Sequence, residues 1–363
     1  MNGHMEQIKD KKEIQKTIIG DSSLKEKVSD DEFFSVLRTI APGTHIRTSL
    51  DGVVKAGKGA IIVEGNERIF SLIDGGFRLN ARFTPQKLIE LSKMDGAIIL
   101  SKDMKKILLA NVLLTPDNRI STNETGTRHK AAERVAKQAG TLVIAVSERK
   151  NEITLFYKNV RHPLIESGGL LRKANEHIQM LEKQRELFDK SLVNLNHLEL
   201  RNYPSLSQAI VAIQKGRMVQ KISSELKKYI IELGKEGVLL KIRLKEITSD
   251  VDSEVDLIIK DYTMTDMKKS KALLEDLSYD ELIDAGFILK ILDYNTSVQN
   301  APIKGWRILS KTTLPAQDIA EIIKETGSLG KALYSNLEFH KAILGEEKAK
   351  MFKNEIENVK LTY

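Results

Sequence analysis

The fold is decided by the stretch Lys93-Met94-Asp95-Gly96-Ala97-Ile98-Ile99-Leu100, in which a carboxylate and a glycine come directly before a short apolar run. Comparable β-rich runs occur at residues 59–63, 107–114, 142–146 and 153–157, with turn signals between them. Between these runs, residues 85–94 and 128–139 have helical spacing. The alternation predicts an N-terminal α/β domain with a mixed, mostly buried β-sheet.

The middle of the chain changes character after residues 167–169, where strand signals vanish. Apolar residues then recur at a spacing of about 3.5, interrupted only by Arg185. They are Leu171, Ala174, Ile178, Leu181, Phe188, Leu192 and Leu195. This spacing predicts a long helix that packs on other helices, and amphipathic segments at 210–233 and 238–262 extend the prediction to an all-α helical spine over residues 163–300.

A small all-α unit is predicted for residues 301–363. Pro315 opens one helix, and a tight Leu344-Gly345 turn separates a helix around 337–342 from one around 347–359. A helix start leaves backbone N–H groups unpaired and carries partial positive charge, so such a turn can present donors to a phosphate.

The composition bounds the function without deciding it. The 363 residues suggest two to three domains, and 57 Lys and Arg against 50 Asp and Glu give a net charge of +7, which favours anionic partners without demanding nucleic acid. The chain has no cysteine, which excludes disulfides, thiolate nucleophiles and Cys-ligated zinc.

No apolar stretch approaches the roughly 18 to 20 residues that cross a bilayer, and the N-terminus lacks an apolar signal core. We therefore expect no membrane partner and a cytoplasmic location. Residues 1–30 are interpreted as an N-terminal extension, whose first five residues resemble a tag remnant.

Polar residues gather around the predicted sheet. Residues 124–130, Glu-Thr-Gly-Thr-Arg-His-Lys, combine hydroxyls, free N–H groups and cations at a helix start, which together can cradle a triphosphate. Arg128 and Lys130 can equally be a solvated charge run, and His129 a structural histidine. Ser147 opens a further polar cluster directly after a strand, and Asp95-Gly96 on its own reads as a capping residue and a turn.

The conjunction of these segments resembles the diadenylate cyclase domain, whose hallmarks are an Asp-Gly-Ala and an Arg-His-Arg motif about thirty residues apart. Here they stand as Asp95-Gly96-Ala97 and Arg128-His129-Lys130, and the resemblance spans residues 31–162. With its helical spine and C-terminal hairpin, the chain is similar to the DNA-scanning branch of that family and not to its shorter membrane-anchored members.

The resemblance implies condensation of two ATP molecules into cyclic di-AMP with release of two pyrophosphates. It implies catalytic roles for Asp95, Arg128 and His129, and a divalent metal, Mg²⁺ or Mn²⁺, held by Asp95 and His129. ATP contacts carried over by the resemblance are Gly96, Ala97, Leu114, Thr127, Arg128, His129, Lys130 and Ser147. The spine implies an assembly of cyclase dimers into an octamer, regulated by branched DNA that contacts Leu344, Gly345 and Lys348.

Two departures from the family pattern weaken parts of this expectation. Lys130 replaces the second arginine of the motif, which keeps the charge but loses a bidentate fork, so we expect lower activity without abolition. Where a DNA-binding hairpin has Gly-Ile-Gly, this chain has Ile343-Leu344-Gly345, and residues 303–363 carry only ten Lys and Arg against eight Asp and Glu.

Two other functions stay open from the sequence. One is a DNA-structure-binding scaffold whose nucleotide domain is weak or vestigial, and the other is an oligomeric assembly protein that binds ATP without reacting.

Overall fold

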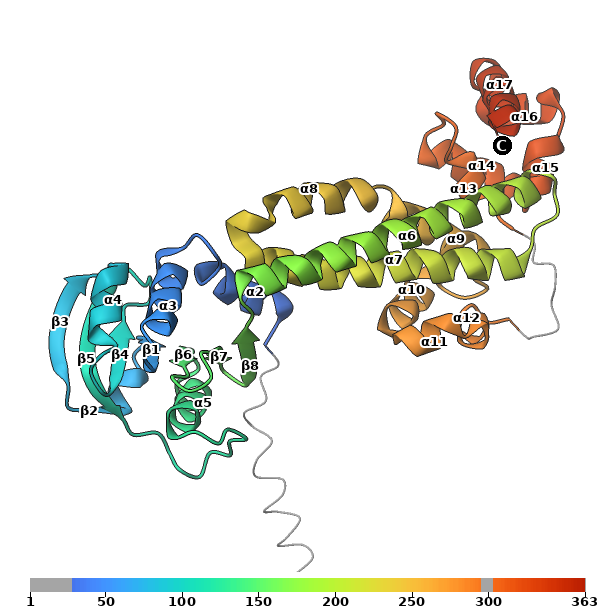
Figure 1. Cartoon of the computed structure of the whole chain (residues 1–363). Coiled ribbons are helices and arrows are strands. Elements are labelled where there is room, and N and C mark those ends of the chain that lie inside the picture. The colour runs from blue at the N-terminus through green and yellow to red at the C-terminus, as the bar shows by residue number, and fades with distance from the viewer. Residues whose placement is uncertain (1–27, 295–302, 363) are drawn as a thin grey trace, which may run out of the picture. The chain divides into compact units, whose positions relative to one another are not determined.

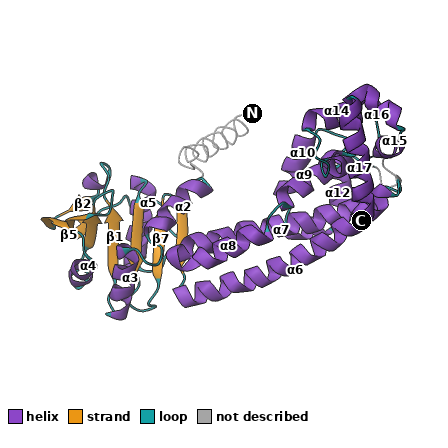
Figure 2. Ribbon diagram, turned by 90° about the horizontal axis from the view of Figure 1, so that it is seen from above, coloured by secondary structure: helices purple, strands orange, loops and turns teal. Residues whose placement is uncertain are grey.

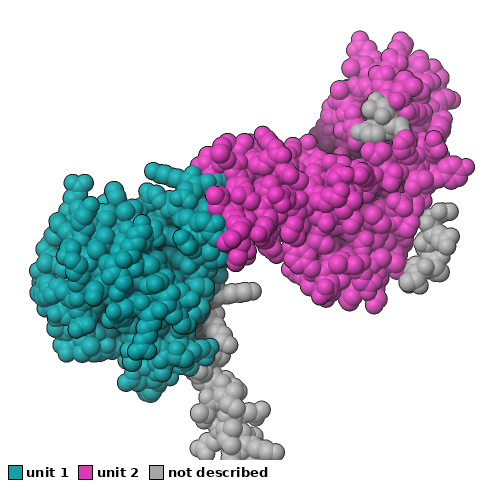
Figure 3. Space-filling model, viewed as in Figure 1, with its two compact units in different colours: residues 1–170, 231–237 teal, residues 171–230, 238–363 magenta. Residues whose placement is uncertain are grey.

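A computed structural model describes residues 28–294 and 303–362, which form two compact units. Unit 1 comprises residues up to 170 together with 231–237, and unit 2 comprises 171–230 and 238–363 (Figure 3). Most of the predicted N-terminal extension, with its tag remnant, lies outside the described residues.

Unit 1 is built on a single eight-stranded sheet (Figure 1). The strands are β1 (Ala60–Glu64), β2 (Ile73–Asp74), β3 (Phe77–Arg82), β4 (Ala97–Leu100), β5 (Lys106–Leu114), β6 (Leu142–Val146), β7 (Ile153–Tyr157) and β8 (Val160–Leu164). Their order is β2-β5-β4-β1-β6-β7-β8, and β3 also pairs with β5. Because β1 and β4 run parallel while the other pairs are antiparallel, the predicted mixed sheet is confirmed.

Helices cover both faces of this sheet (Figure 2). They are α2 (Asp30–Thr39), α3 (His45–Lys55), α4 (Pro85–Leu91), α5 (Thr127–Ala139) and the short 3-10 turns η1 (Ile69–Ser71) and η2 (Gly234–Gly237). Strand side chains alternate between the faces, so Ile62 packs with α2, α3 and α4, whereas Ile61 and Val63 pack with α5. The central strands are therefore buried on both sides, as their continuous apolar runs predict.

The end of α7 (Leu206–Leu233) completes unit 1 from a distant part of the sequence. The Glu232 carboxylate lies 3.0 Å from Nε2 of His162 and accepts the backbone N–H of Ile165. A Cβ on Gly234 would lie 2.7 Å from the Cβ of Ala41, so the chain passes too close there for any side chain.

Unit 2 is entirely helical within the described residues. Besides most of α6 (Ser167–Leu200) and α7, it holds α8 (Val238–Ile247), α9 (Val251–Tyr262), α10 (Met267–Asp276), α11 (Tyr279–Ile283), α12 (Ala285–Ile291), α13 (Trp306–Leu309), α14 (Ala316–Thr326), α15 (Leu329–Tyr334), α16 (Leu337–Leu344) and α17 (Glu346–Thr362). The predicted long helix is α6, whose Leu181, Phe188 and Leu195 are fully buried, although Leu171 is exposed. Arg185 interrupts the apolar spacing because its Nη1 donates to the carbonyl oxygens of Ile247 and Ser249 at the end of α8.

A buried ionic network joins the start of α13 to α6 and α9. The Asp261 carboxylate accepts the backbone N–H groups of Gly305, Trp306 and Arg307 at 2.7–2.9 Å. The fully buried Arg307 guanidinium donates to Glu199 and Asn196 on α6. Since each charge has several partners, the first of the C-terminal helices is anchored on the helices before it.

None of the helices within residues 28–294 and 303–362 combines the length and the apolar character that crossing a lipid bilayer requires.

Candidate active site

The predicted motifs meet at one edge of the sheet, where β1 and β4 begin and β6 ends. Ile61 pairs with Ala97 in the parallel ladder, and Ala60 pairs with Val146 in the antiparallel one. Gly59, Asp95-Gly96 and Ser147 therefore leave the sheet on the same side. Because β5 runs against β4, with Ala97 opposite Val112, the end of β5 at Leu114 lies on this side too. We call this the motif edge.

Glycine is required at two points of the motif edge. Gly96 has φ +89°, and a Cβ there would lie 2.8 Å from the carbonyl carbon of Asn111 and 2.9 Å from the nitrogen of Val112. Gly76 has φ +79°, and its Cβ would lie 2.7 Å from Cγ2 of Val112. Both backbones press on β5, which a side chain would prevent.

Asp95 and Ala97 flank this constrained glycine in opposite environments. The Asp95 side chain is exposed and forms no hydrogen bond or ion pair within the described part of the chain. Ala97 is 1% exposed and packs in the core beneath α5, so only its backbone is available to a ligand. The motif therefore presents one unpaired carboxylate on a rigid turn.

The start of α5 supplies unpaired N–H groups at the same edge. Gly126 is the N-cap and makes no side-chain capping bond, and the first turn from Thr127 carries no acidic residue. The partial positive charge of this helix end is therefore not neutralised by its own residues. Lys130, in the same turn, is half-buried and forms no ion pair among the described residues.

Arg128 reaches back from α5 to the start of β1. Its Nη1 lies only 2.0 Å from the position that a Cβ on Gly59 would take, and 3.9 Å from Oε2 of Glu148. Since Gly59 precedes β1 as Asp95 precedes the neighbouring β4, the structure brings the guanidinium and the Asp95 turn to adjacent strands. Ser147, half-buried in the turn after β6, accepts the Lys150 backbone N–H through its hydroxyl and completes this group.

His129, next to Arg128 on α5, packs against β7. Its ring makes an edge contact with Phe156 of β7, with 6.2 Å between ring centroids. Burial lowers the pKa of His129 below its ordinary value, so the imidazole is neutral at pH 7. In the sheet, β1 and β6 lie between β7 and β4, the strand that Asp95 precedes.

The assignment of Asp95 and His129 as metal ligands, which the resemblance implies, stays a prediction. Across residues 28–294 and 303–362, no group of three or more His, Asp or Glu side chains is arranged to hold a metal ion.

Two residues of the motif edge escape the sequence-based site. Gly59 looks like the ordinary start of a strand, and only its distance to Arg128 reveals that it makes room for the guanidinium. Glu148 stands in the polar cluster after residues 142–146, but its pairing with Arg128 joins residues twenty apart in sequence.

At the C-terminus, the predicted hairpin is a helix pair joined at Gly345, which has φ +82° and ends α16. Ile343 and Leu344 lie within α16, so only Gly345 needs a left-handed backbone there. The first turn of α17 carries Glu346 and Glu347, and Lys348 forms a 2.6 Å ion pair with Asp318. These carboxylates oppose phosphate binding at the turn.

Comparison with known proteins identifies the family. Residues 47–161 match the model described as DisA bacterial checkpoint controller nucleotide-binding, and residues 164–301 match the DisA bacterial checkpoint controller linker region. The DNA integrity scanning protein DisA of Acetivibrio thermocellus is 42% identical over 85% of this chain and 88% of its own length. That of Bacillus subtilis is 41% identical over 84% of this chain and 87% of its own length. Among solved structures, DacA from Staphylococcus aureus matches 38% of this chain and 91% of that chain at 23% identity and a TM-score of 0.29.

The sheet unit and its two motifs thus define a diadenylate cyclase, which confirms the class of enzyme that the resemblance implied. Because its relatives are matched over nearly nine-tenths of their length, the chain belongs to the DisA family of DNA integrity scanning proteins.

Proposed function

We propose that the chain condenses two ATP molecules into cyclic di-AMP and two pyrophosphates across a face-to-face dimer of sheet units. The observation that carries this proposal is the motif edge, where an unpaired Asp95, the Arg128 guanidinium and an uncapped helix start lie on adjacent elements. This combination suits a nucleotide that brings a polyphosphate and a hydroxyl to be activated.

The reaction itself requires two chains. Each 3′-hydroxyl attacks the α-phosphate of the other ATP, so two nucleotides must face each other with their reacting atoms in line. A two-fold axis gives both nucleotides the same surroundings.

The roles of the residues follow from their positions. Asp95 orients the 3′-hydroxyl and accepts its proton, while Arg128, Ser147 and the free N–H of Thr127 bind phosphate oxygens. Lys130 adds positive charge as a point contact. Gly96 and Leu114, both at the motif edge, offer backbone contacts to the adenosine.

A divalent cation, Mg²⁺ or Mn²⁺, fits the donor set of Asp95. Mg²⁺ is commonly held by one or two carboxylates plus substrate phosphates, and Asp95 is a carboxylate with no other partner in the described chain. When bound, the cation neutralises charge that develops on the phosphates. His129, which burial keeps neutral at pH 7, is the second ligand proposed for this cation.

We also propose the larger organisation implied by the family. The cyclase domain spans residues 31–162, the spine 163–300 and the C-terminal domain 301–363, with the spine joining cyclase dimers into an octamer in the cytoplasm. The last boundary falls in residues 295–302, outside the described part of the chain.

The test of the reaction is direct. Purified protein is incubated with ATP and Mg²⁺ or Mn²⁺, and the nucleotides are resolved against authentic cyclic di-AMP, with Asp95→Asn alongside. The variant removes one charge at constant shape, so we expect product formation to fall by two orders of magnitude or more while the oligomer persists in size-exclusion chromatography. Near-normal turnover in Asp95→Asn contradicts the assigned role.

A second activity, regulation by branched DNA, is favoured by the Gly345 turn between α16 and α17, although its carboxylates weaken a phosphate site. Affinity for a four-way junction and for a linear duplex, each measured over a range of salt, tests it, because pure attraction to phosphate does not distinguish the two. Equal, weak binding removes junction recognition. ATP binding without product, together with tight junction binding, leaves the DNA-binding scaffold as the function.

A further inference from the structure

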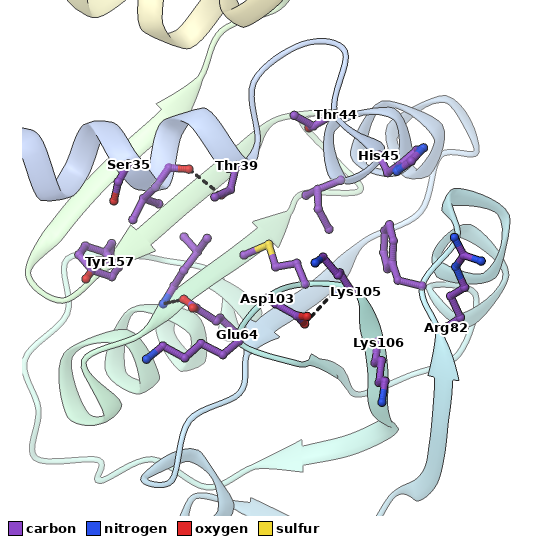
Figure 4. A pocket seen from close by; sticks show the side chains of 16 residues that line it. Ser35, Thr39, Thr44, His45, Glu64, Arg82, Asp103, Lys105, Lys106 and Tyr157 are labelled. Carbon is purple, nitrogen blue, oxygen red and sulfur yellow. Dashed lines mark hydrogen bonds between the residues drawn. The ribbon is translucent and has the colours of Figure 1, made fainter.

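A cavity of about 840 Å³ lies at the opposite end of the sheet from the motif edge (Figure 4). It opens where β1 ends at Glu64, where the turn 101–105 joins β4 to β5, and where β6 begins at Leu142. Residues of α2 and of the start of α3 line its other side. Its volume is within the range of small-molecule sites, roughly 300–1,000 Å³. No proposed catalytic residue lines it.

Some of the walls of this cavity are apolar. They are formed by Val36, Ile46, Phe83, Met104 and Leu142, together with the ring of Tyr157. Phe83 and Leu142 belong to the buried core, and Tyr157 is held in place because its hydroxyl donates to Glu32. A flat apolar group can therefore enter without disturbing a polar network.

Four cations line the same cavity. Arg82, Lys102, Lys105 and Lys106 line it, and none of their side chains forms an ion pair within the described chain. Arg82 stands directly opposite Lys106 in the β3–β5 ladder, where like charges repel. The nearby Asp103 offsets part of this positive charge: its carboxylate accepts the Ser101 hydroxyl and the Lys105 backbone N–H, and these bonds together with the charge of Lys105 lower its pKa. An anionic group bound here removes this repulsion.

Two carboxylates line the cavity, and of these Asp103 is exposed and Glu64 is half-buried (Figure 4). One of its oxygens lies 3.4 Å from both Oγ1 of Thr141 and the backbone nitrogen of Leu142. Burial raises the pKa of Glu64. A ligand that places an amino group beside Glu64 supplies a hydrogen bond to a carboxylate whose existing contacts are long.

We propose that this cavity is a second ligand site, which binds an adenine mononucleotide with its phosphate on the four cations, its base against the apolar wall and its amino edge at Glu64. The dimensions, the excess of cations over carboxylates and the half-buried acceptor Glu64 each match one part of such a ligand. The site is separate from the motif edge, so its occupancy does not depend on the cyclase reaction.

Photolabelling of the full chain with 8-azido-AMP, followed by peptide mapping, tests the proposal. We expect label in peptides from residues 35–46 and 83–106, and at least a tenfold loss of that label in Lys102→Glu/Lys105→Glu. Lys55→Glu, an exposed cation on α3 outside the cavity, serves as the matched control and keeps the label. Label confined to peptides of the motif edge, or unchanged in the double variant, overturns the proposal.

Competition then tests the part assigned to Glu64. AMP should displace the cavity label at a concentration at least tenfold lower than IMP, which carries a carbonyl in place of the amino group. Glu64→Gln should reduce that preference while thermal unfolding shows that the variant is folded. Equal displacement by AMP, IMP and inorganic phosphate contradicts recognition of the base.

Discussion

At the motif edge, the missing side chains of two glycines determine how the neighbouring backbone and side chains pack. Gly96 is fixed because its backbone presses on β5, and this rigidity holds the Asp95 carboxylate clear of the sheet. Gly59 leaves the space that the Arg128 guanidinium fills. The second relation predicts two linked effects.

Replacing Arg128 should weaken phosphate binding and transition-state stabilisation together. In Arg128→Ala we expect kcat/KM for ATP to fall about a hundredfold or more, as for the loss of one charged donor at a reacting phosphate. Unfolding should change little because the side chain is 42% exposed. An unchanged kcat/KM would show that Arg128 is only a surface charge.

Gly59→Ala should act through Arg128. The added methyl group takes the position beside Nη1, so the guanidinium must move, and we expect at least a tenfold loss of kcat/KM. In the double variant Gly59→Ala/Arg128→Ala, the loss should equal that of Arg128→Ala alone. Additive losses would mean that Gly59 matters for another reason, such as strand packing.

At the scale of elements, the sequence predicted the helices and strands that have a regular pattern of apolar residues. It missed the strands that lack such a pattern. The runs at 97–100, 142–146 and 153–157 coincide with β4, β6 and β7, and the spacing around Phe188 gave α6. By contrast, β3 is exposed along almost its whole length, and β8 contains Pro163 at the edge of the sheet, so neither shows the alternation of a half-buried strand.

The sequence likewise predicted some features of the site and missed others. Asp95-Gly96 and Arg128 could be found as motifs because each is contiguous in the chain. The contact of His129 with Phe156 of β7 could not be found in this way, since it joins residues that are far apart in the chain. The cavity at Glu64 gathers residues from 35 to 157 and has no local signature.

The helix α16 should make unit 2 sensitive to acid. His340 is buried, its Nε2 lies 3.0 Å from the carbonyl oxygen of Ala332, and burial lowers its pKa below the usual value of 6.5. As the pH falls below 6.5, the unfolded chain takes up the proton first, so the folded state loses stability.

His340→Gln keeps a donor for Ala332 but does not titrate. We expect the thermal unfolding midpoint of the parent chain to fall more between pH 7.5 and pH 5.5 than that of the variant. Parallel curves would assign the acid sensitivity to other groups.

At the scale of the whole molecule, the proposed reaction between two chains predicts that an inactive chain abolishes the activity of the intact chain with which it pairs. When Asp95→Asn is co-expressed with the parent chain in equal amounts, only about a quarter of randomly formed dimers contain two intact chains. We therefore expect cyclic di-AMP production near a quarter of that of the parent assembly, with chain ratios checked by mass spectrometry. A value near one half would show that each chain works alone.

Unit 1 is discontinuous, since its last contributors are residues 231–237 at the end of α7. A ribosome adds roughly 5–20 residues per second, so Glu232 and Gly234 follow residue 170 by several seconds. During this interval all strands of the sheet have been synthesised, but His162 lacks its contact with Glu232 and Ala41 its contact with Gly234. The cyclase unit can therefore be completed only after α6 and α7 have been synthesised, so its folding depends on the helices of the spine.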